Sequence, residues 1–334
     1  MLKKFYVFAI LIITSATSSI FYWSIEPLSL CADMIEVTIK PNSSARSIIL
    51  QLKHGGIPIE LFNFIVMTRI LNLSTHLKSG SYEFRNGITP YNILKKLVRG
   101  DVKKETTIVI EGWTFKRMRL ELDTNPNLVH LTTRMTDAEL LRTINASNDI
   151  IQRGNGEGLF FPDTYFFDKG TSDISIYQKA YRLMENHLNE VWIERQKALP
   201  YCTPYDVLTA ASIVEKETSY EVDRPLVAAV FANRLKIGMP LQSDPSVIYG
   251  LGSSYNGHLH KRDLQTNVPY NTYIHRGLPP TPISLPSRAA LRAVTCPAHT
   301  DALYFIAKGD RTSVFSNTLE EHNKAIERYI RTHK

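Results

Sequence analysis

The chain has 334 residues, of which 43% are hydrophobic and 21% charged, and its formal net charge is +7. This composition excludes a disordered or low-complexity protein and is typical of a folded one. Its basic residues lie in short scattered groups such as Lys95-Lys96 and Lys103-Lys104, without a dense block interleaved with aromatic residues. Nucleic acid is therefore not an expected partner, and the ordinary meaning of these lysines is a solvated surface.

The N-terminus predicts a membrane anchor. After Lys3 and Lys4, residues 5–23 carry no charge, which is long enough to cross a bilayer, and the preceding lysines favour a cytoplasmic N-terminus. We expect a cytoplasmic stub (1–4), a single transmembrane helix (5–23) in the lipid bilayer, and an extracytoplasmic remainder. A cleaved signal peptide is the alternative, but no A-x-A site ends the apolar stretch.

The cysteines give little information. They lie at positions 31, 202 and 296, without metal-ligand spacing, so the sequence predicts no metal site. Leu30 is too bulky for a lipoprotein cleavage site before Cys31, so lipidation is not expected. In an oxidising compartment Cys202 and Cys296 are able to pair, which the sequence does not decide.

About 300 residues follow the span, more than one core usually holds, so we expect two folded units. The first covers residues 35–101, a small α+β subdomain. Alternation predicts strands over 35–39 and 78–84, and caps and glycines delimit helices at about 44–53, 60–71 and 89–99. This order resembles a LysM-like carbohydrate-binding fold in layout, without a sharp motif. A simple spacer is an equal alternative.

The second unit, residues 105–334, is expected to be a larger mixed α/β catalytic domain, which makes the whole chain α+β. A strand over 106–110 opens it. Residues 157–167 then place five aromatic side chains around a Pro-Asp turn. Sugar rings stack on such surfaces, so Phe161 and Tyr165 are candidate substrate contacts, although an aromatic core corner is the commoner meaning.

The segment 203–218 carries the main candidate for chemistry. Thr203 can cap a helix, Pro204 suits its first position, and Asp206 completes a capping pattern. At about 100° per residue, Glu215 ends a weakly polar face, where burial would raise its pKa and make it a proton donor. Glu217 projects about 200° away, so the two do not form a close pair. We expect Glu217 to support the site or the fold. The plain alternative is that the last turn of this helix merely carries solvated charges.

Polar turns follow this helix. Residues 241–250 join Gln242 and Asp244 to a short apolar run, and residues 270–273 place Tyr270 and Asn271 on a turn. Amide, hydroxyl and carboxyl groups on rigid turns suit a hydroxyl-rich ligand, so a polar loop near the acid is expected here. Each segment alone is ordinary turn chemistry.

Taken together, these blocks resemble one family. They are Glu157-Gly-Leu-Phe-Phe-Pro-Asp-Thr-Tyr, Ala211-Ser-Ile-Val-Glu-Lys-Glu, Asn233-Arg-Leu, Leu241-Gln-Ser-Asp-Pro-Ser-Val-Ile-Tyr-Gly, Tyr270-Asn-Thr-Tyr, Gly277-Leu-Pro-Pro and Glu321-His-Asn. In this order the chain resembles the endolytic murein transglycosylases of the YceG-like (MltG) family over essentially its whole length. One departure is visible, because residues 281–287 lack two glycines that the family usually carries there.

The resemblance implies an enzyme that cleaves the MurNAc-β-1,4-GlcNAc bond inside peptidoglycan strands and leaves a 1,6-anhydroMurNAc end. It implies Glu215 as general acid and then base, with Gln242, Asp244, Tyr270 and Asn271 lining the cleft. It also implies that the enzyme terminates or trims nascent strands, and that peptidoglycan synthases (penicillin-binding proteins) are candidate partners.

Two other classes stay open at this stage. A lysozyme-like muramidase would need a second carboxylate for water or a covalent intermediate, whereas an intramolecular hydroxyl removes that need. A non-catalytic peptidoglycan-binding scaffold would need no acid. Neither a metal cluster nor a phosphate-binding glycine loop occurs in the sequence, so no cofactor is expected.

Overall fold

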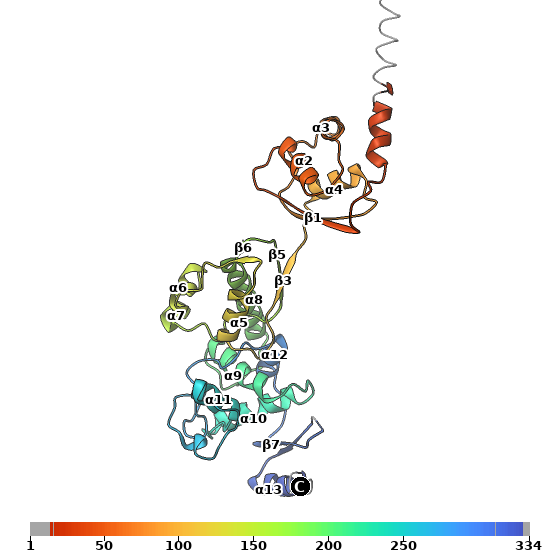
Figure 1. Cartoon of the computed structure of the whole chain (residues 1–334). Coiled ribbons are helices and arrows are strands. Elements are labelled where there is room, and N and C mark those ends of the chain that lie inside the picture. The colour runs from red at the N-terminus through yellow and green to blue at the C-terminus, as the bar shows by residue number, and fades with distance from the viewer. Residues whose placement is uncertain (1–13, 16, 311, 330–334) are drawn as a thin grey trace, which may run out of the picture. The chain divides into compact units, whose positions relative to one another are not determined.

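The computed structural model describes residues 14–15, 17–310 and 312–329, and Figure 1 shows their helices and strands. The chain forms two compact units, one of residues up to 106 together with 166–171, the other of residues 107–165 and 172 onward. Sequence reasoning expected two continuous segments, 35–101 and 105–334. It did not foresee that residues 166–171 return to the first unit.

Unit 1 contains β1 (Met34–Ile39), α2 (Ala45–His54), α3 (Leu61–Ile70), β2 (Gly80–Arg85) and α4 (Pro90–Arg99). The two strands pair antiparallel, with Met34 opposite Arg85 and Ile39 opposite Gly80. The predicted order of strand, helix, helix, strand and helix is confirmed. The LysM-like comparison and carbohydrate binding stay predictions.

Local chemistry explains these boundaries. The Ser44 side chain accepts a hydrogen bond from the backbone N–H of Ser47 at the start of α2, and Thr89 does the same for Asn92 at the start of α4. Gly100 ends α4 with φ of 75°, a left-handed conformation that costs glycine little. These capping predictions are confirmed, and the helices bury one apolar face each in a shared core with the strands.

Just over half of the predicted membrane span (5–23) lies outside the described residues, because residues 1–13 and 16 are not described. Residues 17–25 are helical and belong to unit 1. Among the described residues, no helix combines the length and apolar character that crossing a membrane requires.

From β3 onward the elements are β3 (Glu105–Ile108), α5 (Phe115–Asp123), β4 (Leu128–Val129), α6 (Asp137–Thr143), α7 (Asn148–Arg153), β5 (Thr164–Phe167), β6 (Thr171–Ser172), α8 (Asp173–Ile193), α9 (Pro204–Glu217), α10 (Arg224–Lys236), α11 (Asp244–Leu251), two 3-10 turns (Gly252–Ser254 and Asp263–Gln265), α12 (Arg288–Thr295), β7 (Tyr304–Ala307), β8 (Ser313–Ser316) and α13 (Leu319–Tyr329). The strands form only two-stranded sheets, β3 with β5, β4 with β6, and β7 with β8. The expected mixed α/β domain is therefore mainly helical, and its apolar helix faces pack on one another rather than on a large sheet.

Helix α9 lies at the centre of unit 2. Its neighbours are α8, α10, α11 and α12, and the helix is buried at Tyr205 and from Val207 to Val214. Thr203 accepts from the Asp206 N–H and the Asp206 carboxylate accepts from the Thr203 N–H, a capping box with Pro204 at the first position. The predicted start of this helix is confirmed. Its last turn places Glu215 and Glu217 at the edge of the core, with both carboxyl groups largely buried.

The three cysteines are free and exposed. The pairing of Cys202 with Cys296 that the sequence left open is thus not formed in this structure.

Candidate active site

The two glutamates at the end of α9 have different surroundings. Glu215 Oε2 accepts hydrogen bonds from the backbone N–H of Ser287, at 2.9 Å, and from the Ser287 hydroxyl. Its Oε1 lies 3.6 Å from Arg224 Nη2, and both side chains are nearly buried. Ser287 caps α12 and Arg224 begins α10. Glu215 therefore ties the end of α9 to the starts of two neighbouring helices.

Glu217 lies against a pocket instead. Its Oε1 accepts a 2.6 Å hydrogen bond from the Ser243 hydroxyl. Burial raises the pKa of the Glu217 carboxyl to about 7; the Ser243 hydrogen bond acts to lower it, the charge of Asp244 to raise it and that of Arg234 to lower it. A carboxyl group with this pKa holds a proton near neutral pH, as a general acid must.

The pocket beside Glu217 has a volume of about 320 Å³. It is built from helices α9, α10, α11 and α13, from strand β7 and from the loop before α11, and in Figure 1 these elements lie in the same part of unit 2. Its lining residues are Glu217, Arg234, Leu241, Gln242, Asp244, Tyr273, Tyr304, Phe305, Leu319 and His322. Two predicted substrate residues, Gln242 and Asp244, thus meet Glu217, whereas Glu215 is not among the lining residues.

Arg234 holds the pocket together from α10. Its Nε donates to the Leu303 carbonyl at 2.6 Å, and its Nη1 donates to the Leu241 carbonyl at 2.7 Å. Burial lowers the pKa of this guanidinium, and the charge of Glu217 is among the groups that raise it. The arginine therefore fixes the segment before α11 and the start of β7 around one positive charge.

Gln242 has an unusual backbone. Its φ is 54°, in the left-handed region that non-glycine residues seldom adopt, and its N–H donates to the Thr272 carbonyl at 3.0 Å. Such strain persists where the surrounding structure imposes it, and it clusters at functional sites. Here it turns the chain from Leu241 into Ser243 and α11, so that Ser243 reaches Glu217.

Asp244 and Tyr273 form the other polar wall. The Tyr273 hydroxyl donates to Asp244 Oδ1 at 2.6 Å. Burial raises the pKa of Tyr273, and the Asp244 hydrogen bond raises it further. The phenol therefore stays protonated and orients the Asp244 carboxylate within the pocket.

Two predicted cleft residues point elsewhere. Asn271 is fully buried, and its amide donates to the carbonyls of Leu264, at 3.1 Å, and Thr266, at 2.8 Å. The Tyr270 hydroxyl bonds to Thr281, at 2.9 Å, and its ring meets Tyr249 edge to face. Neither residue lines the pocket beside Glu217. Asn271 Oδ1 accepts a hydrogen bond from the Tyr273 N–H, so Asn271 shapes the turn that carries Tyr273.

The aromatic candidates Phe161 and Tyr165 also lie in the core rather than on an open face. Both are buried, and the Tyr165 hydroxyl donates to the Phe161 carbonyl at 2.5 Å. Neighbouring Phe160 stacks on Phe115 with ring centroids 4.8 Å apart. The segment has the structure of an aromatic core corner, the commoner of the two meanings that its sequence allowed.

A second buried carboxyl group, Glu157, lies in this region. Its Oε1 accepts from the Phe115 N–H at 2.8 Å and its Oε2 from the Tyr249 hydroxyl at 3.1 Å. Burial raises its pKa to about 7, against the lowering effect of those hydrogen bonds. Because Tyr249 belongs to α11, Glu157 braces the helix whose first residue is Asp244.

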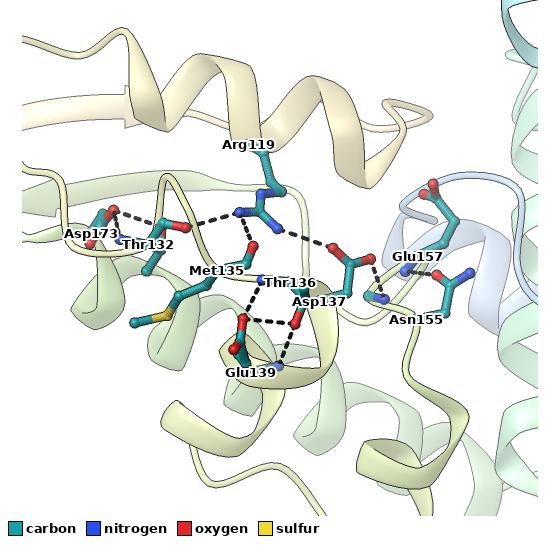
Figure 2. A network of polar contacts seen from close by, with 10 residues as sticks. Arg119, Thr132, Met135, Thr136, Asp137, Glu139, Asn155, Glu157 and Asp173 are labelled. Carbon is teal, nitrogen blue, oxygen red and sulfur yellow. Dashed lines mark hydrogen bonds and ion pairs between the residues drawn. The ribbon is translucent and has the colours of Figure 1, made fainter.

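Figure 2 shows the polar network beside Glu157. Arg119 forms an ion pair with Asp137, at 3.0 Å, and donates to the carbonyls of Thr132 and Met135. Asp137 in turn accepts from the Gly156 N–H at 3.3 Å. These contacts fix the loop before Glu157, and none of the residues drawn lines the Glu217 pocket.

One group of metal-ligand type occurs among the described residues. Asp123, His130 and Asp173 bring ligand atoms within 4.8 Å of one another. Both Asp173 oxygens already accept protein hydrogen bonds, from Leu131 N–H, and from Thr132 N–H and hydroxyl. These bonds account for the position of Asp173.

Residues 281–287, the segment that lacks two glycines usual in the family, are held in place by hydrogen bonds to α9. Ile283 N–H donates to the Ser212 hydroxyl at 2.9 Å, and the Ser284 hydroxyl donates to the Ser212 carbonyl at 3.0 Å. Leu285 is fully buried. The segment therefore runs along α9 and delivers Ser287 to Glu215.

Among the residues that sequence reasoning did not select are Arg234, Tyr273 and His322, which line the pocket, and Ser243, which donates a hydrogen bond to Glu217. Each belongs to a block that the sequence singled out, and Ser243 lies between the chosen residues Gln242 and Asp244. The signal was therefore present in the blocks, but the choice among neighbours depends on which way each side chain points.

Comparisons with known proteins agree with these blocks. The sequence model of the YceG-like family matches residues 37–328. The chain is 32% identical over 265 residues to an endolytic murein transglycosylase of Bacillus subtilis (strain 168), covering 76% of this chain and 73% of that protein. It is 28% identical over 325 residues to an endolytic murein transglycosylase of Streptococcus pneumoniae (strain D39), covering 89% of this chain but 58% of the relative.

A solved structure is also similar. The crystal structure of a yceG-like protein from Listeria monocytogenes superposes with a TM-score of 0.56 at 30% identity, covering 87% of this chain and 98% of that chain. At this identity the likeness extends to sequence as well as fold.

Proposed function

Because the chain belongs to the YceG-like family, as its sequence blocks predicted, we propose that it is an endolytic peptidoglycan lytic transglycosylase. The names of its relatives from Bacillus subtilis and Streptococcus pneumoniae support this activity. The observation that carries the proposal is a buried carboxyl group, Glu217, whose pKa is raised to about 7 and which lies in a pocket lined mainly by polar side chains.

The proposed reaction cleaves the β-1,4 bond between MurNAc and GlcNAc within a strand. The acid gives its proton to the GlcNAc O4 as the bond to the MurNAc C1 breaks. The resulting carboxylate then takes the proton of the MurNAc C6 hydroxyl, whose oxygen attacks C1 and closes a 1,6-anhydro ring. One carboxyl group serves both steps and no water is consumed.

We assign the acid to Glu217 and not, as the sequence alone suggested, to Glu215. Glu217 lines the pocket, and the pKa of its carboxyl group is raised. Both oxygens of Glu215, in contrast, already contact Ser287 or Arg224. In this assignment Glu215 holds three helices together. The helix geometry that separates the two side chains is the same in both interpretations.

Other pocket residues have roles in binding. Gln242 and Asp244 face the pocket with acceptor and donor groups suited to sugar hydroxyls and acetamido groups. His322 stacks on Tyr304, and its Nδ1 has no hydrogen-bond partner among the described residues. Burial lowers the pKa of His322, so a neutral imidazole lines the pocket.

A lysozyme-like muramidase is the second candidate, because Asp244 supplies another carboxylate in the same pocket. The hydrogen bond from Tyr273 to Asp244 favours an orienting role over a base for water. The two mechanisms give different ends, so product mass separates them.

We further propose that residues 5–23 anchor the protein in the bacterial inner membrane with the N-terminus inside, and that the enzyme trims or terminates strands beside peptidoglycan synthases. The uncharged stretch after Lys3 and Lys4 supports the anchor.

The deciding experiment is mass analysis of the products from purified peptidoglycan. Internal strand cuts with 1,6-anhydroMurNAc ends are expected. Reducing-end MurNAc as the primary product would establish hydrolysis, and unchanged strand length would establish a binding protein.

A further inference from the structure

Unit 1 carries an apolar groove between the N-terminal helix and helix α3. Its volume is about 380 Å³, and Phe21, Ile25, Met67, Ile70, Leu71 and Tyr91 supply most of its lining. The remaining lining residues are Thr17, Ile20 and Ser24. A groove with so few polar groups does not suit a sugar, which needs several oriented donors and acceptors.

Helix α3 extends this apolar surface. Its inner face buries Phe64 completely, yet Phe62 is 74% exposed and Ile70 is 58% exposed. Arg69 is the one charged residue within α3. A helix on a water-facing surface normally presents polar side chains outward, so α3 has the composition of a helix whose outer face is covered.

The course of the chain identifies the cover. Phe21 and Tyr22 belong both to the uncharged stretch 5–23 and to the exposed surface beside the groove. Ile20 and Trp23 pack against the core of unit 1, so no flexible linker separates this helix from the folded unit. A membrane that residues 5–23 enter therefore lies directly beside the groove.

We propose that the groove and the outer face of α3 rest in the interfacial layer of the bilayer, with lipid acyl chains filling the groove. Aromatic side chains are enriched at this depth, and Phe21, Tyr22 and Tyr91 are exposed there. Figure 1 shows the N-terminal helix beside α3, with β1 on the other side of unit 1. The inference rests on the proposed membrane anchor and adds that the folded unit itself is seated on lipid.

The test uses the full chain in lipid nanodiscs of phosphatidylethanolamine and phosphatidylglycerol. Cys31, Cys202 and Cys296, all exposed and free, are replaced by serine, and one spin label is attached through Ile70→Cys. The matched control is Met34→Cys, because Met34 is an apolar residue of β1 that is 50% exposed. A third label, through Ile10→Cys, reports insertion of the N-terminal stretch.

Relaxation by oxygen, which concentrates in lipid, is compared with relaxation by a water-soluble nickel chelate. The Ile70 label should be several-fold less accessible to nickel than the Met34 label while remaining open to oxygen. Equal nickel access at both sites, with the Ile10 label inside lipid, would overturn the seating but leave the anchor intact. An Ile70 label shielded from both reagents would indicate a protein contact and would also overturn it. Nickel access at Ile10 would reject the anchor itself.

Discussion

The two sides of the last turn of α9 differ although the glutamates are two residues apart. On one side, Glu215 contacts a backbone N–H, a hydroxyl and an arginine, all of which suit an ionised carboxylate. On the other, Glu217 receives one hydroxyl donor and is otherwise desolvated beside a pocket. In the proposed assignment, one helix end carries a carboxyl group that links helices and a proton donor on opposite faces, because the elements packed on each face define its role.

Replacing Glu217 with glutamine should have the largest effect. The variant keeps the shape and a hydrogen bond to Ser243 but loses the transferable proton, so strand cleavage should fall by about 10²–10⁴-fold. Anhydro ends released from purified peptidoglycan measure it, with exposed Glu221→Gln as the matched control. Near-normal cleavage by folded Glu217→Gln protein would reject the assignment.

Glu215→Gln should act on stability more than on chemistry. It removes the charge that Arg224 and Ser287 contact, which should cost about 1–3 kcal/mol, while cleavage by the folded protein changes less than tenfold. Thermal unfolding and cleavage rates are measured on the same samples. An unchanged Tm together with lost cleavage would return the role of acid to Glu215, as the sequence first indicated.

Ser243→Ala should move the pH profile. The Ser243 hydroxyl lowers the pKa of Glu217, so its removal raises that pKa. Because the acid must be protonated, the alkaline limb of kcat/KM, expected near pH 7 in the native enzyme, should shift upward. Ser246→Ala, which removes a neighbouring buried hydroxyl, is the control. A limb that stays in place would mean that another group controls it.

Glu157→Gln should have the smallest effect on cleavage and a clear effect on the pH dependence of stability. The pKa of Glu157 is raised from 4.5 to about 7 in the folded state, so unfolding releases a proton between these values. Stability should therefore fall as pH rises from about 4.5 to 7 and level off above, by at most about 1.4 kcal/mol per pH unit for one group.

The variant should flatten this slope without altering the Glu217-dependent limb of the activity profile. Denaturant unfolding at a series of pH values measures the slope. Glu217→Gln protein is the comparison, because the pKa of the native Glu217 carboxyl is raised to about the same value as that of Glu157. An unchanged slope in Glu157→Gln protein would contradict the assignment.

The sequence determined the local boundaries and the family. Capping residues such as Thr203 and Thr89 and stop signals such as Gly100 act within one helical turn, so their effects can be read without the rest of the fold. The order of the blocks likewise identified the YceG-like family, because the order can be compared without knowing how the blocks contact one another in the fold. The return of residues 166–171 to unit 1, the helix α11 and the β7–β8 hairpin went unpredicted. The first two depend on packing partners distant in sequence.

Only the tertiary structure decided which residue of each block faces the pocket. Helix periodicity correctly separates Glu215 from Glu217 but does not say what lies beyond either face. Ser287 and Arg224 arrive at Glu215 from α12 and α10, and Ser243 arrives at Glu217 on the strained turn at Gln242. Burial sets a carboxyl pKa through all surrounding elements together, which is why the proposed proton donor is chosen from the fold and not from the spacing of the sequence.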